Sequence, residues 1–170
     1  RDYIAATDAV ARPVRDNARI VLTGAFCEQP PLGLIKSIEM AGCYIVDDDF
    51  MLVTRMLFDD VVETGDPLEE LSKSFLHRSM QTSSKYDEFK KDKGKYLLDS
   101  TKLNAGEGVI FAAPSFCDPA LLERPMLQSV LNAHKIPYTA FKYAENTGQM
   151  APIREQAGTF ADSIKLWSAA

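Results

Sequence analysis

The sequence lacks the features that define three broad classes of protein. Only three cysteines occur in 170 residues, at Cys27, Cys43 and Cys117, and their odd number and wide spacing exclude the disulfide framework of a small secreted domain. No apolar run approaches the roughly 20 residues that a membrane-spanning helix needs. Positive charge is not in excess either, because 19 Lys and Arg face 24 Asp and Glu, for a net charge of −5. We therefore expect a cytoplasmic protein that binds neither membranes nor nucleic acid.

Familiar nucleotide-binding and hydrolytic signatures are missing as well. The segment that begins at Gly24 does not have the spacing of a dinucleotide-binding GxGxxG turn, and the sequence contains no GxxxxGK[ST] phosphate-binding loop. The two histidines, His77 and His134, both lie in predicted helices, so no Ser-His-Asp set can be assembled from them. The chemistry of this chain has to be sought in other residue types, chiefly its thiols.

What is present is the composition and pattern of one α/β domain. Hydrophobic residues make up 46% of the chain and charged residues 25%, which is ordinary for a globular protein. Apolar runs predict four strands, at 19–23, 43–46, 108–112 and 137–143. Helical patterns predict six later helices, at 32–41, 50–62, 66–78, 85–102, 118–134 and 152–167. Strands that are apolar throughout and alternate with helices indicate a flavodoxin-like (Rossmann-like) doubly wound parallel sheet of about four strands.

The first segment has helical spacing of its apolar side chains but precedes the first strand. We predict a helix over residues 1–17 and expect residues 1–18 to link from an N-terminal domain that this chain does not contain. Residues 19–170 would then form a C-terminal α/β domain. A shortened or tagged chain is the alternative explanation for a beginning inside a helix.

Two thiols are expected at one edge of the sheet. Ligands of open parallel sheets bind beyond the carboxyl ends of the strands, where the strand order reverses. Cys27 follows the first strand and Cys117 the third, and these strands are neighbours in a flavodoxin-like order. Cys117 also precedes a helix, whose N-terminal dipole favours a thiolate, the ligand of iron–sulfur clusters. An inert loop cysteine is the alternative; Cys43, at the start of the second strand, is expected to be a small buried hydrophobe.

Two polar groups give weaker signals at the same edge. The run Asp47, Asp48 and Asp49 follows the second strand and could bind a divalent cation or simply cap a loop. A second group follows the last strand and extends into the start of the last helix; its members are Glu145, Asn146, Gln149, Arg154, Glu155 and Gln156. Polar groups at a helix N-terminus suit a phosphate or a carbonyl oxygen, and ordinary helix capping is the alternative.

Four segments of the sequence resemble the benzoyl-CoA reductase and 2-hydroxyacyl-CoA dehydratase family. They are GAFCEQPP at 24–31, GCYIVDDD at 42–49, PSFCDP at 114–119 and IREQAGTF at 153–160. The resemblance extends from about residue 19 to residue 167 and is greatest to the ATP-dependent benzoyl-CoA reductase subunits.

The resemblance implies a cofactor as well as a fold. Members have two flavodoxin-like domains with a [4Fe-4S] cluster between them, and this chain is similar to the C-terminal one. By this resemblance Cys117 is a cluster ligand, the remaining ligands come from the part of the subunit outside this chain, and Cys27 is a possible further ligand. Ser115 and Phe116, with the backbone N–H groups around them, would surround and tune the cluster.

The reaction that the resemblance implies is low-potential electron transfer to a CoA thioester. A separate ATP-dependent activator would pass electrons to this component and a second homologous subunit, and benzoyl-CoA would be reduced to a cyclic dienoyl-CoA. One alternative is a 2-hydroxyacyl-CoA dehydratase component, which works by radical dehydration. The other is a non-catalytic flavodoxin-like binding or assembly module. We expect this chain to be inactive by itself.

Overall fold

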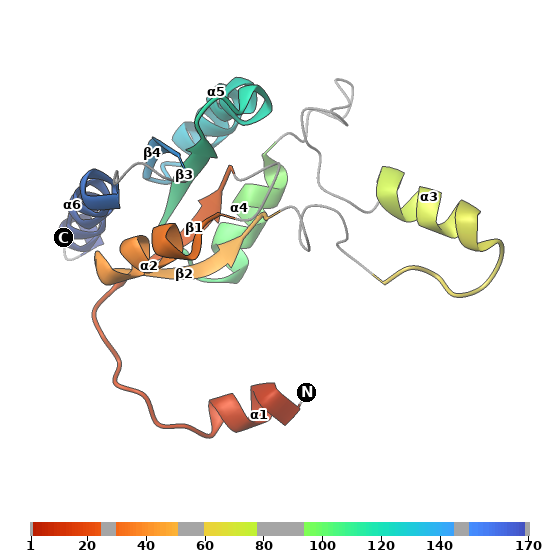
Figure 1. Ribbon diagram of the computed structural model, residues 1–170, viewed down its shortest axis with the longest axis horizontal. Helices are drawn as coiled ribbons and strands as arrows, with labels where there is room; N and C mark the ends of the chain where they lie inside the picture. Colours follow the sequence, from red (N-terminus) through yellow and green to blue (C-terminus); the bar gives the residue numbers. More distant parts are fainter. Residues whose placement is uncertain (1, 25–29, 51–59, 78–93, 145–149, 169–170) are drawn as a thin grey trace.

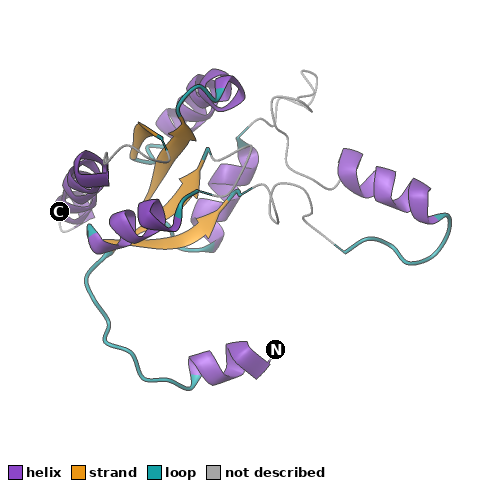
Figure 2. Cartoon of the chain, viewed as in Figure 1, coloured by secondary structure: helices purple, strands orange, loops and turns teal. Residues whose placement is uncertain are grey.

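Four parallel strands form the centre of the molecule (Figures 1 and 2). The structure is a computed structural model that describes residues 2–24, 30–50, 60–77, 94–144 and 150–168. The strands are β1 (Ala18–Thr23), β2 (Cys43–Asp48), β3 (Gly108–Pro114) and β4 (Tyr138–Tyr143). Their order is β2-β1-β3-β4, so the chain runs from β1 to β2 on one side and then crosses to β3 on the other side. This reversal confirms the flavodoxin-like, doubly wound sheet that the sequence predicts.

Helices cover both faces of this sheet. The helices of the described part of the chain are α1 (Asp2–Asp8), α2 (Leu32–Met40), α3 (Pro67–His77), α4 (Lys95–Leu103), α5 (Asp118–Ala133) and α6 (Met150–Ser168). The pair α2 and α6 pack against each other on one face, and α4 and α5 lie on the other (Figure 1).

The strands bury apolar side chains on both faces, which explains their continuous apolar runs. Along β1, Ile20 and Leu22 point into the cluster formed with α2 and α6, whereas Val21 points into the cluster formed with α4 and α5. All three side chains are at most 1% exposed. Complete burial of one such side chain is worth about 1.5–3 kcal/mol, so each face of the sheet is held by its own core.

The N-terminal helix is shorter than the predicted helix over 1–17. In the structure α1 ends at Asp8, and residues 11–17 are not helical. Pro13 lies in the middle of this stretch, where it has no N–H to donate and its ring clashes with the carbonyl group four residues earlier. The prediction followed the spacing of the apolar residues and underestimated this proline.

Two further predicted helices differ from the structure in part. The helix predicted over 50–62 is not present at Phe50 or at 60–62, while the residues between them lie outside the described part. Of the helix predicted over 85–102, the described portion is α4, which begins at Lys95 after Gly94.

Other helix ends follow the chemistry expected of them. At the end of α2, Gly42 has φ +98°, a left-handed conformation that glycine adopts without steric cost, and its N–H donates to the carbonyl oxygen of Glu39 (3.2 Å). At the start of α3, Asp66 Oδ1 accepts hydrogen bonds from the backbone N–H groups of Leu68 (2.9 Å) and Glu69 (3.0 Å).

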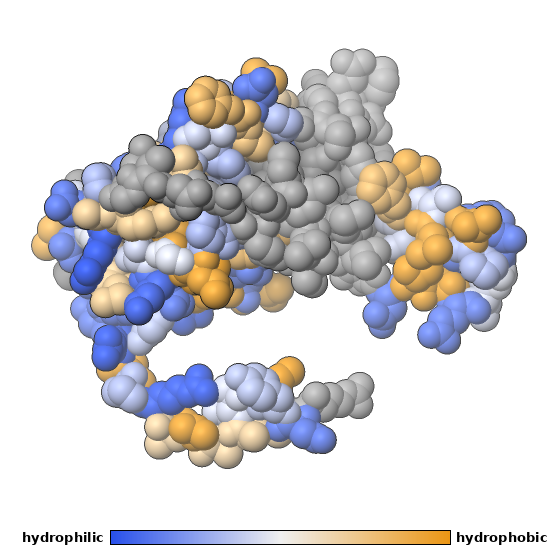
Figure 3. Space-filling model, viewed as in Figure 1, coloured by the Kyte–Doolittle hydropathy of each residue, from blue (hydrophilic) through white to orange (hydrophobic). Residues whose placement is uncertain are grey.

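Helices α1 and α3 stand away from the sheet in Figure 1, and none of the residues of α1 is buried. Hydrophobic side chains gather on α3 (Figure 3), where Leu68, Leu71 and Leu76 are all more than half exposed. Among the helices of the described segments, none has both the length and the apolar composition to cross a membrane.

Candidate functional site

The thiol of Cys117 lies at the carboxyl edge of the sheet, as expected. It follows the end of β3, the strand paired with β1, so it lies beside the point where the strand order reverses. Only 7% of the residue is exposed, and it packs with Ala113 and Ala120 in a small cluster separate from the two main cores. The thiol is therefore shielded and lies close to the edge, not deep within the main cores.

The turn that carries Cys117 is held by backbone hydrogen bonds. The N–H of Ser115 donates to the carbonyl oxygen of Tyr143 on β4 (2.7 Å), and the N–H of Cys117 donates to that of Pro114 (3.1 Å). Between them, Phe116 has φ +68°, which is uncommon for a residue with a side chain, and it is 94% exposed. A cofactor-tuning role for Ser115 and Phe116 stays a prediction, because their described hydrogen bonds serve to hold the turn in place.

The helix after this turn is α5, which starts at Asp118 as predicted and has Cys117 as its N-cap. Asp118 places a negative charge in the first turn, where the helix dipole stabilises it. The consequence is that the Cys117 side chain stands directly at the positive end of α5.

The remaining candidate ligands are not brought together in the described part of the chain. Cys27, Glu145 and Asn146 all lie outside the described residues. Arg154 is exposed near the start of α6. Close to it, the Nε2 group of Gln156 donates to Thr139 Oγ1 (2.9 Å) and to the carbonyl oxygen of Ala140 (3.1 Å) on β4. Binding of a ligand by the group that includes Arg154 stays a prediction.

Cys43 is a buried thiol, as the sequence predicts. It is fully buried in the core between α2 and α6, with its Sγ 3.9 Å from the carbonyl oxygen of Ala157. Burial raises its pKa to about 11, and the nearby positive charge of Lys165 only partly opposes this shift. Because the thiolate is the reactive form, Cys43 is an unreactive packing residue at neutral pH.

The three consecutive aspartates do not converge on one point, because each accepts hydrogen bonds from different partners. Asp47 accepts hydrogen bonds from Ser100 Oγ and from Asn104 Nδ2 (3.0 Å), both of them at or beside the last turn of α4. Asp48 accepts a hydrogen bond from the backbone N–H of Phe50 (3.0 Å), and burial raises the pKa of its carboxyl group. In the ranges that the structure describes, no group of three or more His, Cys, Asp or Glu side chains is arranged to hold a metal ion.

Asp49 is a buried carboxylate at this edge, at 1% exposure. Its Oδ2 accepts hydrogen bonds from Thr23 Oγ1 (2.5 Å) and Tyr96 Oη (3.2 Å), and its Oδ1 accepts one from the N–H of Gly24 (3.2 Å). Our sequence reasoning missed this network. The available signal was the two-residue spacing of Asp47 and Asp49 at the end of β2; both carboxylates accept hydrogen bonds from α4 or from the residue after it.

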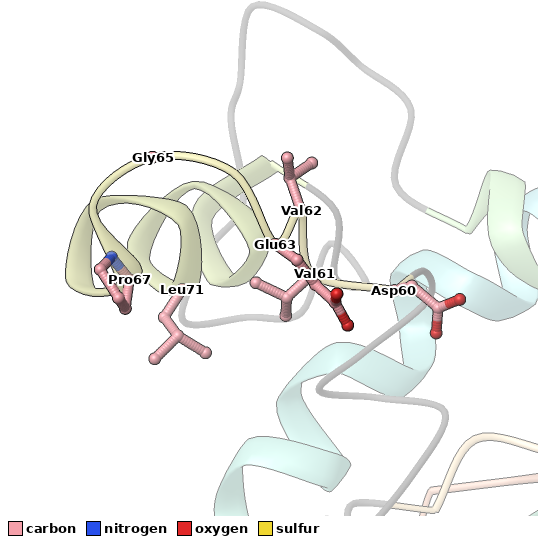
Figure 4. Close-up of a pocket in the computed structure, with 7 residues that line it drawn as sticks. All are labelled: Asp60, Val61, Val62, Glu63, Gly65, Pro67 and Leu71. Atoms are coloured by element: carbon pink, nitrogen blue, oxygen red, sulfur yellow. The ribbon is translucent and has the colours of Figure 1, made fainter.

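One open pocket lies beside α3 (Figure 4), and it is formed by the segment before that helix together with its first turns. Its lining residues are Asp60, Val61, Val62, Glu63, Gly65, Pro67 and Leu71. None of these residues belongs to the edge that carries Cys117 and Asp49.

The fold and its edge define a flavodoxin-like α/β domain with a shielded thiol where such sheets bind ligands. Comparison with known proteins adds the family. The family description "2-hydroxyglutaryl-CoA dehydratase, D-component" matches residues 2–164, and the chain belongs to this family.

Individual relatives show how the family varies. The chain is 64% identical over 168 residues to one of the benzoyl-CoA reductase subunits of Thauera aromatica, over 99% of this chain and 44% of the relative. It is 28% identical to the (R)-phenyllactyl-CoA dehydratase beta subunit of Clostridium sporogenes, over 88% of this chain and 38% of the relative. It is 26% identical to the beta subunit of (R)-2-hydroxyglutaryl-CoA dehydratase of Acidaminococcus fermentans, over 88% of this chain and 39% of the relative. The chain thus spans less than half the length of each of these relatives.

Proposed function

We propose that this chain is part of a subunit of an ATP-dependent benzoyl-CoA reductase, which reduces benzoyl-CoA to a cyclic dienoyl-CoA. The observation that carries the proposal is the contrast in identity: 64% to a benzoyl-CoA reductase subunit against 28% and 26% to two dehydratase subunits. Fold alone does not decide between these reactions, because one fold hosts many functions.

The proposed cofactor is a [4Fe-4S] cluster with Cys117 as one ligand. Such clusters are held by thiolates, and Cys117 is a shielded thiol at the edge of the sheet where ligands bind. Cys117 is also the N-cap of α5, so it lies at the N-terminal end of that helix. The residues present can therefore supply one ligand of a cluster. The other ligands would come from outside the described residues, Cys27 among the candidates.

When bound, the cluster supplies low-potential single electrons, and the protein supplies position and surroundings. Cys117 would hold one iron. Ala113, Ala120 and Leu121 pack around the thiol and exclude water from its inner side. Pro114 and Tyr143 accept the hydrogen bonds that fix the turn, so the sulfur keeps one position relative to the sheet.

The same proposal implies partners. A second homologous subunit and an ATP-dependent activator would complete the enzyme, and the substrate would be a CoA thioester. On this proposal the chain is a cytoplasmic C-terminal domain, and its N-terminal segment, residues 1–18, connects it to the rest of the subunit. The exposed apolar side chains of Tyr3 (83%) and Ile4 (64%) on α1 are consistent with such a contact.

The second candidate function is radical dehydration of a 2-hydroxyacyl-CoA. The family description and two of the relatives carry dehydratase activity in their names. The third candidate function is that of a non-catalytic binding or assembly module. It would give no role to the shielded thiol at the edge.

The deciding experiment uses the full-length subunit with its partner, prepared anaerobically. We expect bound iron and sulfide, loss of iron in Cys117→Ala, and retention of iron in the control Cys43→Ala, which removes a thiol buried in the core. Turnover of benzoyl-CoA but not of a 2-hydroxyacyl-CoA would support the reductase, and the opposite preference the dehydratase. Unchanged iron content in Cys117→Ala would remove Cys117 from the ligands, and a complex with neither iron nor turnover would favour the non-catalytic module.

A further inference from the structure

The carboxyl edge of the sheet contains a buried carboxylate that the proposed chemistry does not use. Asp49 follows β2 and is 1% exposed, and the side chain of Thr23 at the end of β1 is fully buried beside it. Removing an ionised group from water is costly unless hydrogen bonds compensate for the lost hydration. Here three donors converge on the two carboxylate oxygens.

These donors come from two different parts of the chain. Thr23 and Gly24 belong to the end of β1, and Tyr96 belongs to the first turn of α4. In addition, the N–H of Asp49 donates to the carbonyl oxygen of Leu22 on β1 (3.3 Å). Asp49 therefore ties the ends of β1 and β2 and the start of α4 to one point.

The bond to Gly24 fixes the direction in which the chain leaves β1. Gly24 has φ +108°, and a Cβ added to it would lie 3.0 Å from the carbonyl oxygen of Ala112 on β3. The end of β1 therefore rests directly on the backbone of the neighbouring strand. The residue after Ala112 is Ala113, which packs against Cys117. A path of contacts runs from Asp49 through Gly24 and β3 to the thiol.

We propose that Asp49 is a positioning residue, whose buried carboxylate holds Gly24 against β3 and thereby sets the position and shielding of Cys117 at the carboxyl edge. The importance of this position for a cofactor rests on the proposed function; the mechanical link between Asp49 and Cys117 does not. Asp49 is separated from Cys117 by this path and acts through other residues.

Asp47, within β2, offers a matched control. It lies two residues before Asp49, faces the same helix and also accepts hydrogen bonds from the region of α4, namely those of Ser100 and Asn104. Replacement of either aspartate by leucine, which has a similar shape, removes the acceptors and the charge. Only Asp49→Leu leaves the N–H of Gly24 without its acceptor.

The test compares Asp49→Leu, Asp49→Asn and Asp47→Leu in the full-length subunit assembled with its partner. Two measurements need no cofactor: hydrogen exchange of the peptide that ends at Gly24, and the alkylation rate of Cys117 in protein stripped of metal. An unpaired buried N–H weakens the local structure. Asp49→Leu is therefore expected to increase both the hydrogen-exchange rate and the alkylation rate about ten-fold or more. Asp47→Leu is expected to change neither, even if it lowers the melting temperature. Asp49→Asn keeps an oxygen that can accept from the Gly24 N–H. Its hydrogen-exchange rate in the peptide that ends at Gly24 is therefore expected to be close to that of the wild type.

A third measurement tests the consequence for the cofactor. In iron-loaded complex, Asp49→Leu is expected to lose iron or to change the electron paramagnetic resonance spectrum, and Asp47→Leu is not. Wild-type complex without iron would overturn the proposed function while the exchange and alkylation results still decide the role of Asp49. Equal acceleration in the two leucine variants, or none in Asp49→Leu, would overturn the positioning role.

A folding failure of Asp49→Leu would not end the test. Thr23→Val and Tyr96→Phe each remove one donor and keep the carboxylate, so they loosen its hold on Gly24 more gently. Both are expected to increase exchange at Gly24 and alkylation of Cys117 in the same direction. Wild-type rates in both variants would contradict the inference.

Discussion

Replacement of Gly24 by alanine should destabilise the protein through two separate effects. Its φ of +108° lies in the region that residues with a side chain avoid, and such strain costs about 1–3 kcal/mol. The new Cβ would also lie 3.0 Å from the carbonyl oxygen of Ala112. That oxygen belongs to a strand paired on both sides, so it cannot retreat, and overpacking of this kind costs about 1–3 kcal/mol. The two effects together predict a loss of about 2–6 kcal/mol.

Thermal unfolding followed by far-ultraviolet circular dichroism measures this loss. For a chain of this size, 1 kcal/mol shifts the melting temperature by about 2–4 °C, so Gly24→Ala should lower it by roughly 4–24 °C. The control is Gly33→Ala in α2, where the glycine is exposed and an added Cβ would meet nothing within 4 Å. Alanine favours the helix, so the control should raise stability by up to about 1 kcal/mol. A Gly24→Ala protein as stable as the control would refute the argument that β1 rests on β3 at this point.

Two further predictions concern titration. Burial is the main cause that raises the pKa of Asp48, the charges of Asp47 and Asp49 add to it, and the Phe50 N–H opposes it. The charged form is thus disfavoured in the folded state. The free energy of unfolding of Asp48→Asn, measured in urea, should therefore equal or exceed that of the wild type near pH 7, and the variant should lose this advantage near pH 4. A variant less stable than the wild type at neutral pH would contradict this. Burial also raises the pKa of Cys43 from 9.0 to about 11, so its contribution to stability is full below about pH 9 and is lost as the pH rises towards about 11. Cys43→Ala should lack this loss, and a constant difference in urea midpoint between the two proteins from about pH 8 to about pH 11 would rule out this linkage.

Much of the fold could be predicted from local sequence patterns. The apolar runs located the four strands of the described sheet, and the predicted helices over 32–41 and 66–78 correspond to α2 and α3. The position of Cys117 at the carboxyl edge also followed, because in a parallel sheet every loop after a strand emerges at the same edge. The N-terminal segment was less predictable, since apolar spacing and the proline at Pro13 gave opposing signals.

The sequence by itself determined which segments become strands and helices and which residues follow each strand, because these features depend on patterns a few residues long. Only the tertiary structure decided that Asp47 turns to Ser100 and Asn104 while Asp49 turns to Gly24 and Tyr96. The Asp49 carboxylate joins residues 26 and 47 positions away, and no local pattern records such separations. Packing of α4 against the sheet brings these donors together and excludes water, and burial makes each hydrogen bond matter for the geometry of the edge.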